Sequence, residues 1–144
     1  MIIRPMEEKD LDQAAALEQQ NFSRPWSRAL FADALEKEYY RYFVAVDDEQ
    51  NLLGTAGVIC LDHEGEITNV CVREDARKQG IAYKLLTEIL NNCKNLGIQN
   101  FTLEVRNSNM PAINLYQKLG FKNEGIRRNF YEDPVEDAVI MWKR

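Results

Sequence analysis

The sequence predicts a protein of the α/β or α+β class, in which helices cover a mixed, largely antiparallel β-sheet. Two observations predict this class. Segments with the apolar pattern of strands recur between segments whose apolar residues follow helical spacing, and turn residues separate the two kinds. The 144 residues are enough for one domain, residues 1–144, with one sizeable hydrophobic core. Hydrophobic residues make up 45% of the chain and charged residues 28%, as in ordinary globular proteins.

The first half of the chain predicts two helices and four strands. The first helix carries an apolar stripe that includes Leu11, Ala14 and Leu17. Ser27 has the side chain of an N-cap and precedes the second helix. In order, the expected elements are strand 2–4, helix 6–20, loop 22–26, helix 27–37, strand 42–46, turn 47–51, strand 53–61 and strand 66–72, the last two joined around His63 and Gly65.

The second half predicts two further helices and three strands. Apolar residues recur at helical spacing over residues 80–95, and Gly97 fits the end of that helix. Pro111 suits the first turn of the next helix, and Gly120 follows its end. In order, the expected elements are helix 80–95, strand 101–105, helix 111–119, strand 122–130 and strand 138–143.

Composition and charge exclude several classes of protein. The net charge of −5, with both signs interspersed, argues against a nucleic-acid binder, which needs clustered Lys and Arg. The apolar runs are too short to cross a bilayer, and we expect no signal peptide or membrane anchor. His63 is the only histidine, so we expect no metal site and no catalysis by a Ser-His or Cys-His pair. Three cysteines without a CxxC pattern predict free thiols and a cytoplasmic location.

The stretch VCVREDARKQGIAYKLL, residues 70–86, passes from a strand to a helix through a basic, glycine-containing turn. The start of a helix has unpaired N–H groups and a dipole that favours anions. Gly80 lets a ligand approach the backbone, Ala82 keeps the next position small, and Arg77 and Lys78 add positive charge. These features suit a phosphate or pyrophosphate. An ordinary solvated turn before a helix remains the alternative.

The stretch FTLEVRNSNMPAINLYQKLGF, residues 101–121, contains the candidates for proton transfer. Glu104 lies on the opposite strand face from Phe101, Leu103 and Val105. It either reaches a cleft or serves a partner, or else it is an edge residue in water or an ion-pair partner of Arg106.

Two further residues of this stretch also have structural interpretations. Tyr116 is either a core aromatic with its hydroxyl at the rim or a functional phenol. Asn109 is placed as a helix cap. The combination of these residues with Glu104, rather than any one of them, points to a site.

Together these motifs resemble the GNAT acetyltransferase superfamily. Residues 77–82 match the R/Q-x-x-G-x-G/A acetyl-CoA loop, with alanine in the last position. A narrower resemblance, to the bacterial ribosomal-protein-alanine N-acetyltransferases of the RimI type, is carried by LEVRNSN at 103–109, AINLY at 112–116, LGF at 119–121, PWS at 25–27, RRNFY at 127–131, EDA at 136–138 and Met141. Relatives often carry two tyrosines where this chain has Phe130-Tyr131.

The resemblance implies a six- or seven-stranded sheet flanked by four helices, with the fourth and fifth strands splayed so that pantetheine enters between them. It implies acetyl-CoA as co-substrate. By the same resemblance the backbone of one strand binds the cofactor arm, the loop that follows holds the pyrophosphate, and an asparagine also touches the cofactor. In this chain those residues are Val70, Cys71 and Val72 for the arm, Arg77, Lys78, Gln79, Gly80, Ile81 and Ala82 for the pyrophosphate, and Asn109.

The implied reaction is direct acetyl transfer to an amine. We expect Glu104 to take the amine proton, directly or through water, and Tyr116 to return a proton to the departing thiolate. A covalent route through Cys71 lacks a base. A carboxylate of ordinary pKa is a weak base for an ammonium proton, so we expect partial burial to raise the pKa of Glu104.

The expected acceptor is a protein N-terminus, starting with alanine, on a basic ribosomal protein. It would lie between residues 22–26 and 130–138, where Glu136 and Asp137 could attract a cationic peptide. A lysine or small-amine acetyltransferase and a non-catalytic acyl-CoA sensor remain the alternatives. Nothing in the sequence indicates an oligomeric state.

Overall fold

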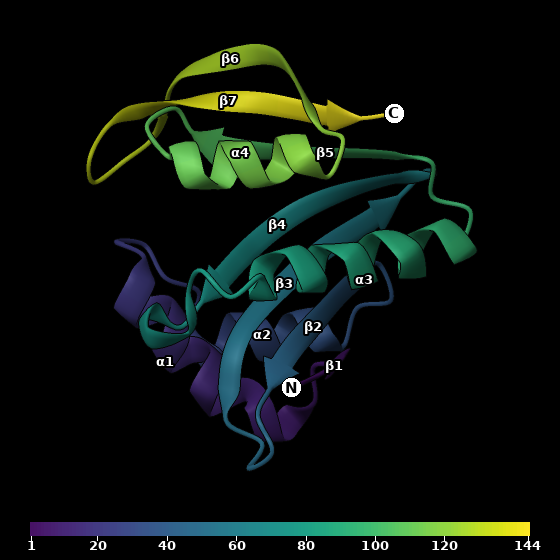
Figure 1. Cartoon of the computed structure of the whole chain (residues 1–144), viewed down its shortest axis with the longest axis vertical. Helices are drawn as coiled ribbons and strands as arrows, with labels where there is room; N and C mark the ends of the chain where they lie inside the picture. Colours follow the sequence, from purple (N-terminus) through teal and green to yellow (C-terminus); the bar gives the residue numbers. More distant parts are fainter.

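The computed structural model describes residues 1–144 and contains a seven-stranded sheet with helices on both faces (Figure 1). The strands are β1 (Ile2–Pro5), β2 (Tyr40–Val46), β3 (Leu52–Leu61), β4 (Glu64–Val72), β5 (Asn100–Arg106), β6 (Lys122–Tyr131) and β7 (Glu136–Lys143). The α-helices are α1 (Leu11–Asn21), α2 (Arg28–Leu35), α3 (Ile81–Asn95) and α4 (Met110–Lys118). The strand order is β1-β2-β3-β4-β5-β7-β6.

The sheet is antiparallel except where β4 meets β5. These two strands run parallel and pair only over Glu64–Glu66 and Asn100–Thr102. Beyond those residues they diverge, and Figure 1 shows β5, β6, β7 and α4 standing apart from the rest of the molecule. The splay between the fourth and fifth strands is therefore confirmed, and the backbone of β4 after Glu66 has no strand partner on the β5 side.

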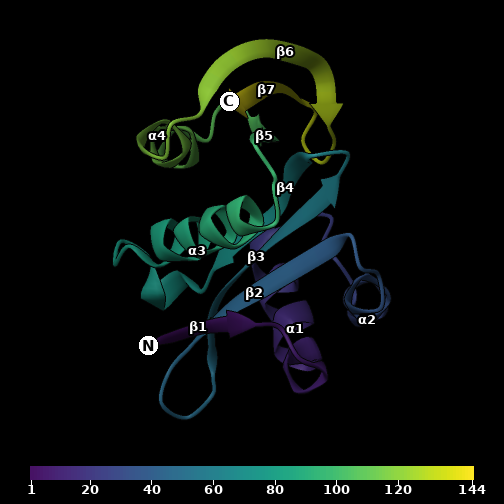
Figure 2. The ribbon, with the colours of Figure 1, turned by 90° about the vertical axis from the view of Figure 1, so that its right-hand side faces the viewer.

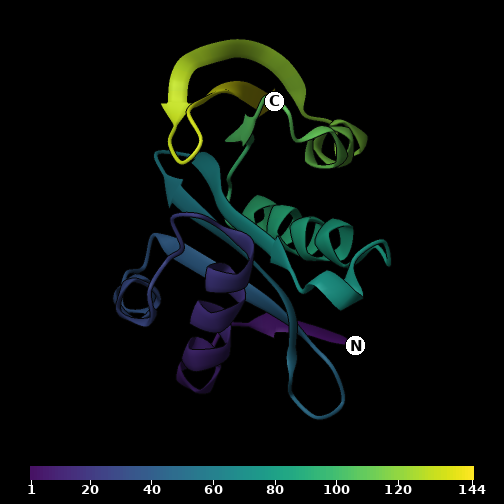
Figure 3. The same cartoon turned by 90° about the vertical axis from the view of Figure 1, so that its left-hand side faces the viewer.

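The helices divide between the two faces of the sheet. Figures 2 and 3 show α1 and α2 on one face, and α3 and α4 on the other. The larger core lies under α3, whose Leu85, Leu86 and Ile89 are fully buried. The smaller core lies under α1 and α2 and includes Leu11 and Phe31. No helix has both the length and the apolar character needed to cross a membrane.

Two helix boundaries differ from the prediction. The first α-helix begins at Leu11 rather than at residue 6, because the Asp10 side chain accepts the N–H of Glu7 at 2.8 Å and holds Glu8–Asp10 in a 3-10 turn. The second helix ends at Leu35 rather than at residue 37, because the chain that follows tightens into i→i−3 hydrogen bonds.

The predicted helix caps are confirmed. Ser27 Oγ accepts the N–H of Leu30 at 3.2 Å, and Asn109 Oδ1 accepts the N–H of Ala112 at 3.3 Å. Gly97 and Gly120 follow α3 and α4 with φ of +87° and +98°, the left-handed conformation that glycine adopts without strain.

One connection differs from the prediction. The turn between β3 and β4 consists of Asp62 and His63, both at positive φ, whereas Gly65 already lies within β4. The strand begins earlier than expected because Gly65 pairs with Cys60 of β3 and with Phe101 of β5.

Candidate active site

The turn before α3 combines a left-handed backbone with unpaired N–H groups. Lys78 and Gly80 adopt positive φ, +63° and +79°, and turn the chain sharply into the helix. The first three backbone N–H groups of α3, residues 81–83, have no acceptor within the protein. A Cβ built at Gly80 would meet nothing within 4 Å, and residues 80–83 all line an open cavity. The geometry fits a phosphate group approaching the backbone.

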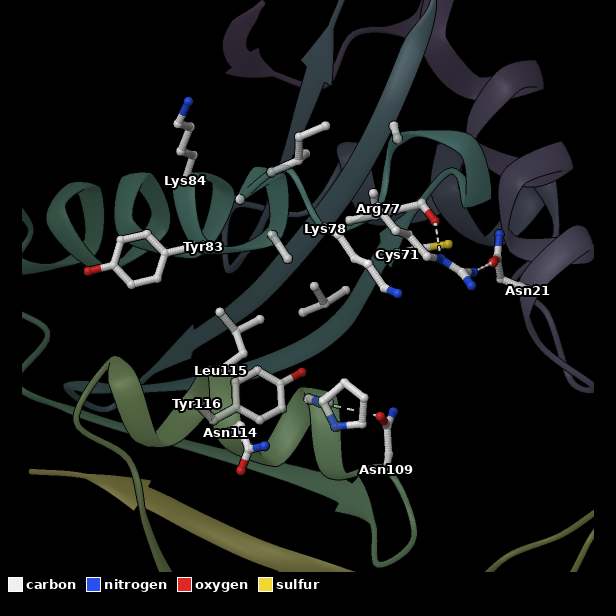
Figure 4. Close-up of a pocket in the computed structure, with 18 of the residues that line it drawn as sticks. Asn21, Cys71, Arg77, Lys78, Tyr83, Lys84, Asn109, Asn114, Leu115 and Tyr116 are labelled. Atoms are coloured by element: carbon white, nitrogen blue, oxygen red, sulfur yellow. Dashed lines mark hydrogen bonds between the residues drawn. The ribbon is translucent and has the colours of Figure 1, made fainter.

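A cavity of about 1170 Å³, which we call the helix-side cavity, extends from this turn to α4 (Figure 4). Most of the predicted cofactor-binding residues line it, namely Val70, Cys71, Val72, Arg77, Lys78, Gly80, Ile81, Ala82 and Asn109. Gln79 does not line the cavity, although it belongs to the matched motif. In Figure 4 the side chains of Lys78 and Tyr116 point into this space from opposite walls.

The two basic residues of the turn have different roles. Arg77 Nε donates to the carbonyl of Val72 at 3.2 Å, and Arg77 Nη2 donates to Asn21 Oδ1, which fastens the turn to β4 and α1. Lys78 makes no hydrogen bond or ion pair within the protein. Lys78 is therefore a free positive charge beside the turn, and Lys84 and Lys118, which also line the cavity, are likewise without an ion-pair partner.

A second cavity of about 780 Å³, the loop-side cavity, lies between the α1–α2 loop and the β6–β7 loop. It shares five residues with the helix-side cavity, which are Asn21, Phe22, Val70, Asn109 and Tyr116. The two spaces therefore meet where β4 and α4 face one another. A long ligand in one can present its end to a second ligand in the other.

Glu104 lines the loop-side cavity from β5, with 24% of its side chain exposed. Its ion-pair partner is Arg127 of β6, whose Nε lies 3.2 Å from Glu104 Oε2. The alternative of a pair with Arg106 was wrong, because Arg106 instead contacts Glu136 at 3.3 Å. Burial raises the pKa of Glu104 above its ordinary value, against the opposing effect of Arg127. This is the direction expected for a general base.

Tyr116 is the one candidate for proton transfer that lines both cavities. The residue is 8% exposed, and its ring packs edge-on against Phe121 with centroids 6.0 Å apart. Its hydroxyl makes no hydrogen bond within the protein. Burial raises the pKa of the Tyr116 phenol, so the group stays protonated and can donate.

Cys71 has no nucleophilic character in this structure. Its thiol donates to the carbonyl of Leu17 at 3.7 Å, and burial raises the pKa of Cys71 to about 12. A thiol with that pKa is almost entirely protonated at neutral pH. All three cysteines are free.

The acidic residues at the mouth of the loop-side cavity differ from those expected. Glu136 accepts the N–H of Ser108 at 2.6 Å, and Asp137 accepts the N–H of Asn129 at 2.9 Å. Neither lines the cavity, since both carboxylates are occupied in holding local backbone. Two other acidic residues, Glu132 and Asp133, line it instead.

Glu18 was not predicted as a site residue, but it lines the loop-side cavity from α1 with only 1% of the residue exposed. Its Oε1 accepts the N–H of Trp26 at 3.1 Å and Asn69 Nδ2 at 3.2 Å. The available signal was positional: Glu18 follows Leu11 and Ala14 at helical spacing, so a carboxylate occupies a position of the buried stripe.

The sheet splays beside the start of α3, and the two cavities meet at Tyr116. Comparison with known proteins identifies the class of protein that has this arrangement. Residues 10–121 match the model of the acetyltransferase (GNAT) family, and the chain belongs to this family. Enzymes of the family use acetyl-CoA as acetyl donor.

Relatives extend over the whole chain. The [ribosomal protein bS18]-alanine N-acetyltransferase of Escherichia coli (strain K12) is 35% identical over 141 residues, which cover 96% of this chain and 94% of that protein. The protein of the same name from Haemophilus ducreyi (strain 35000HP) is 32% identical over 143 residues, 97% of each chain. The crystal structure of the ribosomal-protein-S18-alanine N-acetyltransferase from Escherichia coli superposes with a TM-score of 0.89 at 34% identity, over 99% of this chain and 92% of that one.

Proposed function

We propose that this protein transfers the acetyl group of acetyl-CoA to the N-terminal α-amine of a protein, and that its acceptor is a ribosomal protein beginning with alanine, of the bS18 kind. The single observation that carries the proposal is the meeting of the two cavities at Tyr116 and Val70. Relatives named for this activity are 32–35% identical over almost their full length, which supports the choice of acceptor. A ribosomal acceptor would place the protein in the cytoplasm.

The helix-side cavity is the proposed site for acetyl-CoA. The N–H groups of residues 81–83 and the ammonium of Lys78 would hold the pyrophosphate. The β4 backbone after Glu66, which lacks a partner on the β5 side, would receive the cofactor arm. Its N–H groups would also polarise the thioester carbonyl as negative charge develops on the oxygen.

The loop-side cavity is the proposed site for the acceptor. An α-ammonium has an ordinary pKa of about 8 and must lose a proton before the nitrogen can attack. Glu104 lines this cavity and would accept that proton, directly or through water. As the C–N bond forms and the C–S bond breaks, Tyr116 would give its proton to the departing thiolate.

A lysine or small-amine acetyltransferase would also need a base and an acid such as Glu104 and Tyr116. Only the identity of the acetylated amine distinguishes these functions. An acyl-CoA sensor needs neither a base nor an acid, and the presence of Tyr116 at the junction of the cavities, with Glu104 in the loop-side cavity, favours catalysis.

The test is to incubate the protein with acetyl-CoA and a basic peptide that begins with alanine, and to locate the added acetyl group by tandem mass spectrometry. The controls are the same peptide with its α-amine blocked and a version without lysine. Acetyl on the α-amine, in the lysine-free peptide as well, is the expected result. Label on lysine alone would make the protein a lysine acetyltransferase, and binding of acetyl-CoA without transfer to any amine would support the sensor.

A further inference from the structure

Four carboxylates line the loop-side cavity, and three of them have a cationic partner. Glu104 contacts Arg127 at 3.2 Å, and Arg24 reaches Glu132 at 2.5 Å and Asp133 at 2.8 Å. The fourth carboxylate, Glu18, has no Lys or Arg nitrogen within 4.0 Å. The cations that line the cavity are already paired, because Arg24 is engaged as above and Arg106 contacts Glu136.

Glu18 also carries an unpaired oxygen. Both of its hydrogen bonds, from Trp26 and Asn69, end on Oε1, while Oε2 is buried and has no donor. Burial raises the pKa of Glu18, and the two hydrogen bonds oppose that shift. The ionisable groups that interact with Glu18 are Tyr42 of β2 and Cys71 of β4, and neither is a cation. A buried carboxylate without a cation costs several kcal/mol of stability, so its presence here calls for a reason.

The surroundings of Glu18 hold it in place at the cavity wall. Thr68 and Asn69 lie together opposite Gly57 of β3, in a bulge of β4. Tyr42 packs its ring against Gly57, and its hydroxyl lies 3.2 Å from Thr68 Oγ1 and 3.3 Å from Asn69 Oδ1. Asn69 in turn donates to Glu18. This chain of hydrogen bonds uses only Oε1, so Oε2 is left without a donor on a residue that lines the cavity.

We propose that Glu18 is the anion that selects a positively charged acceptor, drawing the α-ammonium of the incoming peptide into the loop-side cavity. This proposal rests on the proposed function. Oε2 is covered from solvent, so the Glu18 carboxylate attracts the ammonium electrostatically rather than by a direct hydrogen bond. Water screens this attraction only weakly because the carboxylate is buried. In this proposal Glu18 favours binding of the α-ammonium, and Glu104 then removes its proton.

The test measures a preference for charge rather than activity. In the presence of coenzyme A, calorimetry gives the Kd of an alanine-first peptide and of its α-hydroxy analogue, which has no ammonium. The wild type should bind the amine peptide more tightly, by a factor on the order of ten or more. Glu18→Gln keeps an oxygen for Trp26 and Asn69 but removes the charge, and it should abolish most of this preference. Glu88→Gln, on the exposed face of α3 and outside both cavities, should keep it.

Two further readouts separate the possible outcomes. Glu18→Gln should unfold at the same temperature as the wild type or higher, because it removes an uncompensated buried charge. Glu104→Gln should keep most of the preference, because Arg127 already offsets the Glu104 charge. A preference that survives in Glu18→Gln, or one lost in Glu104→Gln, overturns the role of Glu18. If Glu18→Gln does not fold, the Glu104→Gln result alone decides. Failure of the wild type to acetylate any α-amine would count against the proposed function. The binding preference is measured without turnover, so it would still decide the role of Glu18.

Discussion

Replacing Gly80 by valine tests the proposed phosphate site at the start of α3. The chain offers a matched control, Gly97, at the other end of the same helix. Gly80 precedes α3 with φ of +79°, and Gly97 follows it with φ of +87°. A Cβ at either glycine would meet nothing within 4 Å. Gly80→Val and Gly97→Val therefore introduce the same side chain at a positive φ, and only the first does so in the helix-side cavity, next to residues 81–83 with their unpaired N–H groups.

The shared cost of both substitutions follows from the left-handed backbone. A residue with a Cβ loses about 1–2 kcal/mol there relative to glycine. With about 2.1 cal/mol/K of unfolding entropy per residue, a chain of this length loses about 3–7 °C of thermal midpoint. Both variants should show that decrease, because neither Cβ clashes with the protein.

The two variants should differ in binding. Gly80→Val should weaken the affinity for acetyl-CoA by about tenfold or more, which corresponds to about 1.4 kcal/mol, because the branched side chain fills the space where a phosphate would approach the backbone. Gly97→Val should bind like the wild type. Titration calorimetry with coenzyme A, beside thermal melts of all three proteins, checks both. If Gly80→Val and Gly97→Val bind equally well, the phosphates bind elsewhere.

Three further predictions concern the proposed base Glu104, the proposed acid Tyr116 and a buried ion pair. Glu104→Gln should lower kcat about a hundredfold or more with an unchanged Kd for acetyl-CoA. In the wild type kcat/KM should fall as the pH decreases through the raised pKa of Glu104, because the base is then protonated, and unchanged turnover of the variant at every pH would exclude Glu104 as base. Tyr116→Phe removes a hydroxyl without a hydrogen bond, so kcat should fall at least about tenfold while the melting temperature stays constant, and full activity would exclude Tyr116 as the acid. Asp10 is buried, which opposes ionisation, but Arg4 at 2.7 and 2.9 Å and the N–H of Glu7 hold the pKa of Asp10 below its ordinary value. Its contribution is therefore present at neutral pH and lost as the pH falls through the folded-state pKa, and Asp10→Asn should cost about 1.5–3 kcal/mol at pH 7 in urea unfolding but much less in strong acid.

Local sequence signals predicted the helices and strands well. Gly80 was expected to let a ligand approach the backbone, and the structure leaves the space around it open, although its φ of +79° was not foreseen. Asn109 and Ser27 were identified as caps because a cap needs only residues three positions away. The splay of the sheet was different, since it was expected from the resemblance to a family and not from strand patterns.

The features that the sequence did not reveal depend on contacts between distant residues. The partner of Glu104 is Arg127, on a strand two places away in the sheet, and spacing along the chain had suggested Arg106 instead. Glu136 accepts the N–H of Ser108, which follows β5, and this contact exists only because β5 pairs with β7 in the folded sheet. Glu18 was overlooked because a single carboxylate in an amphipathic helix usually faces water, and only the packing of α1 on the sheet buries it.

The most direct test of the whole account is a competition among acceptors in one reaction. Equal concentrations of the alanine-first peptide, an α-blocked peptide containing lysine, and spermidine are mixed with acetyl-CoA and the protein, and mass spectrometry follows each acetylated product over time. The ratio of initial rates gives the ratio of kcat/KM values. The account predicts that the α-amine is acetylated at least about a hundredfold faster than either competitor, a difference of about 2.7 kcal/mol. Equal rates, or a faster reaction of lysine or spermidine, would contradict it.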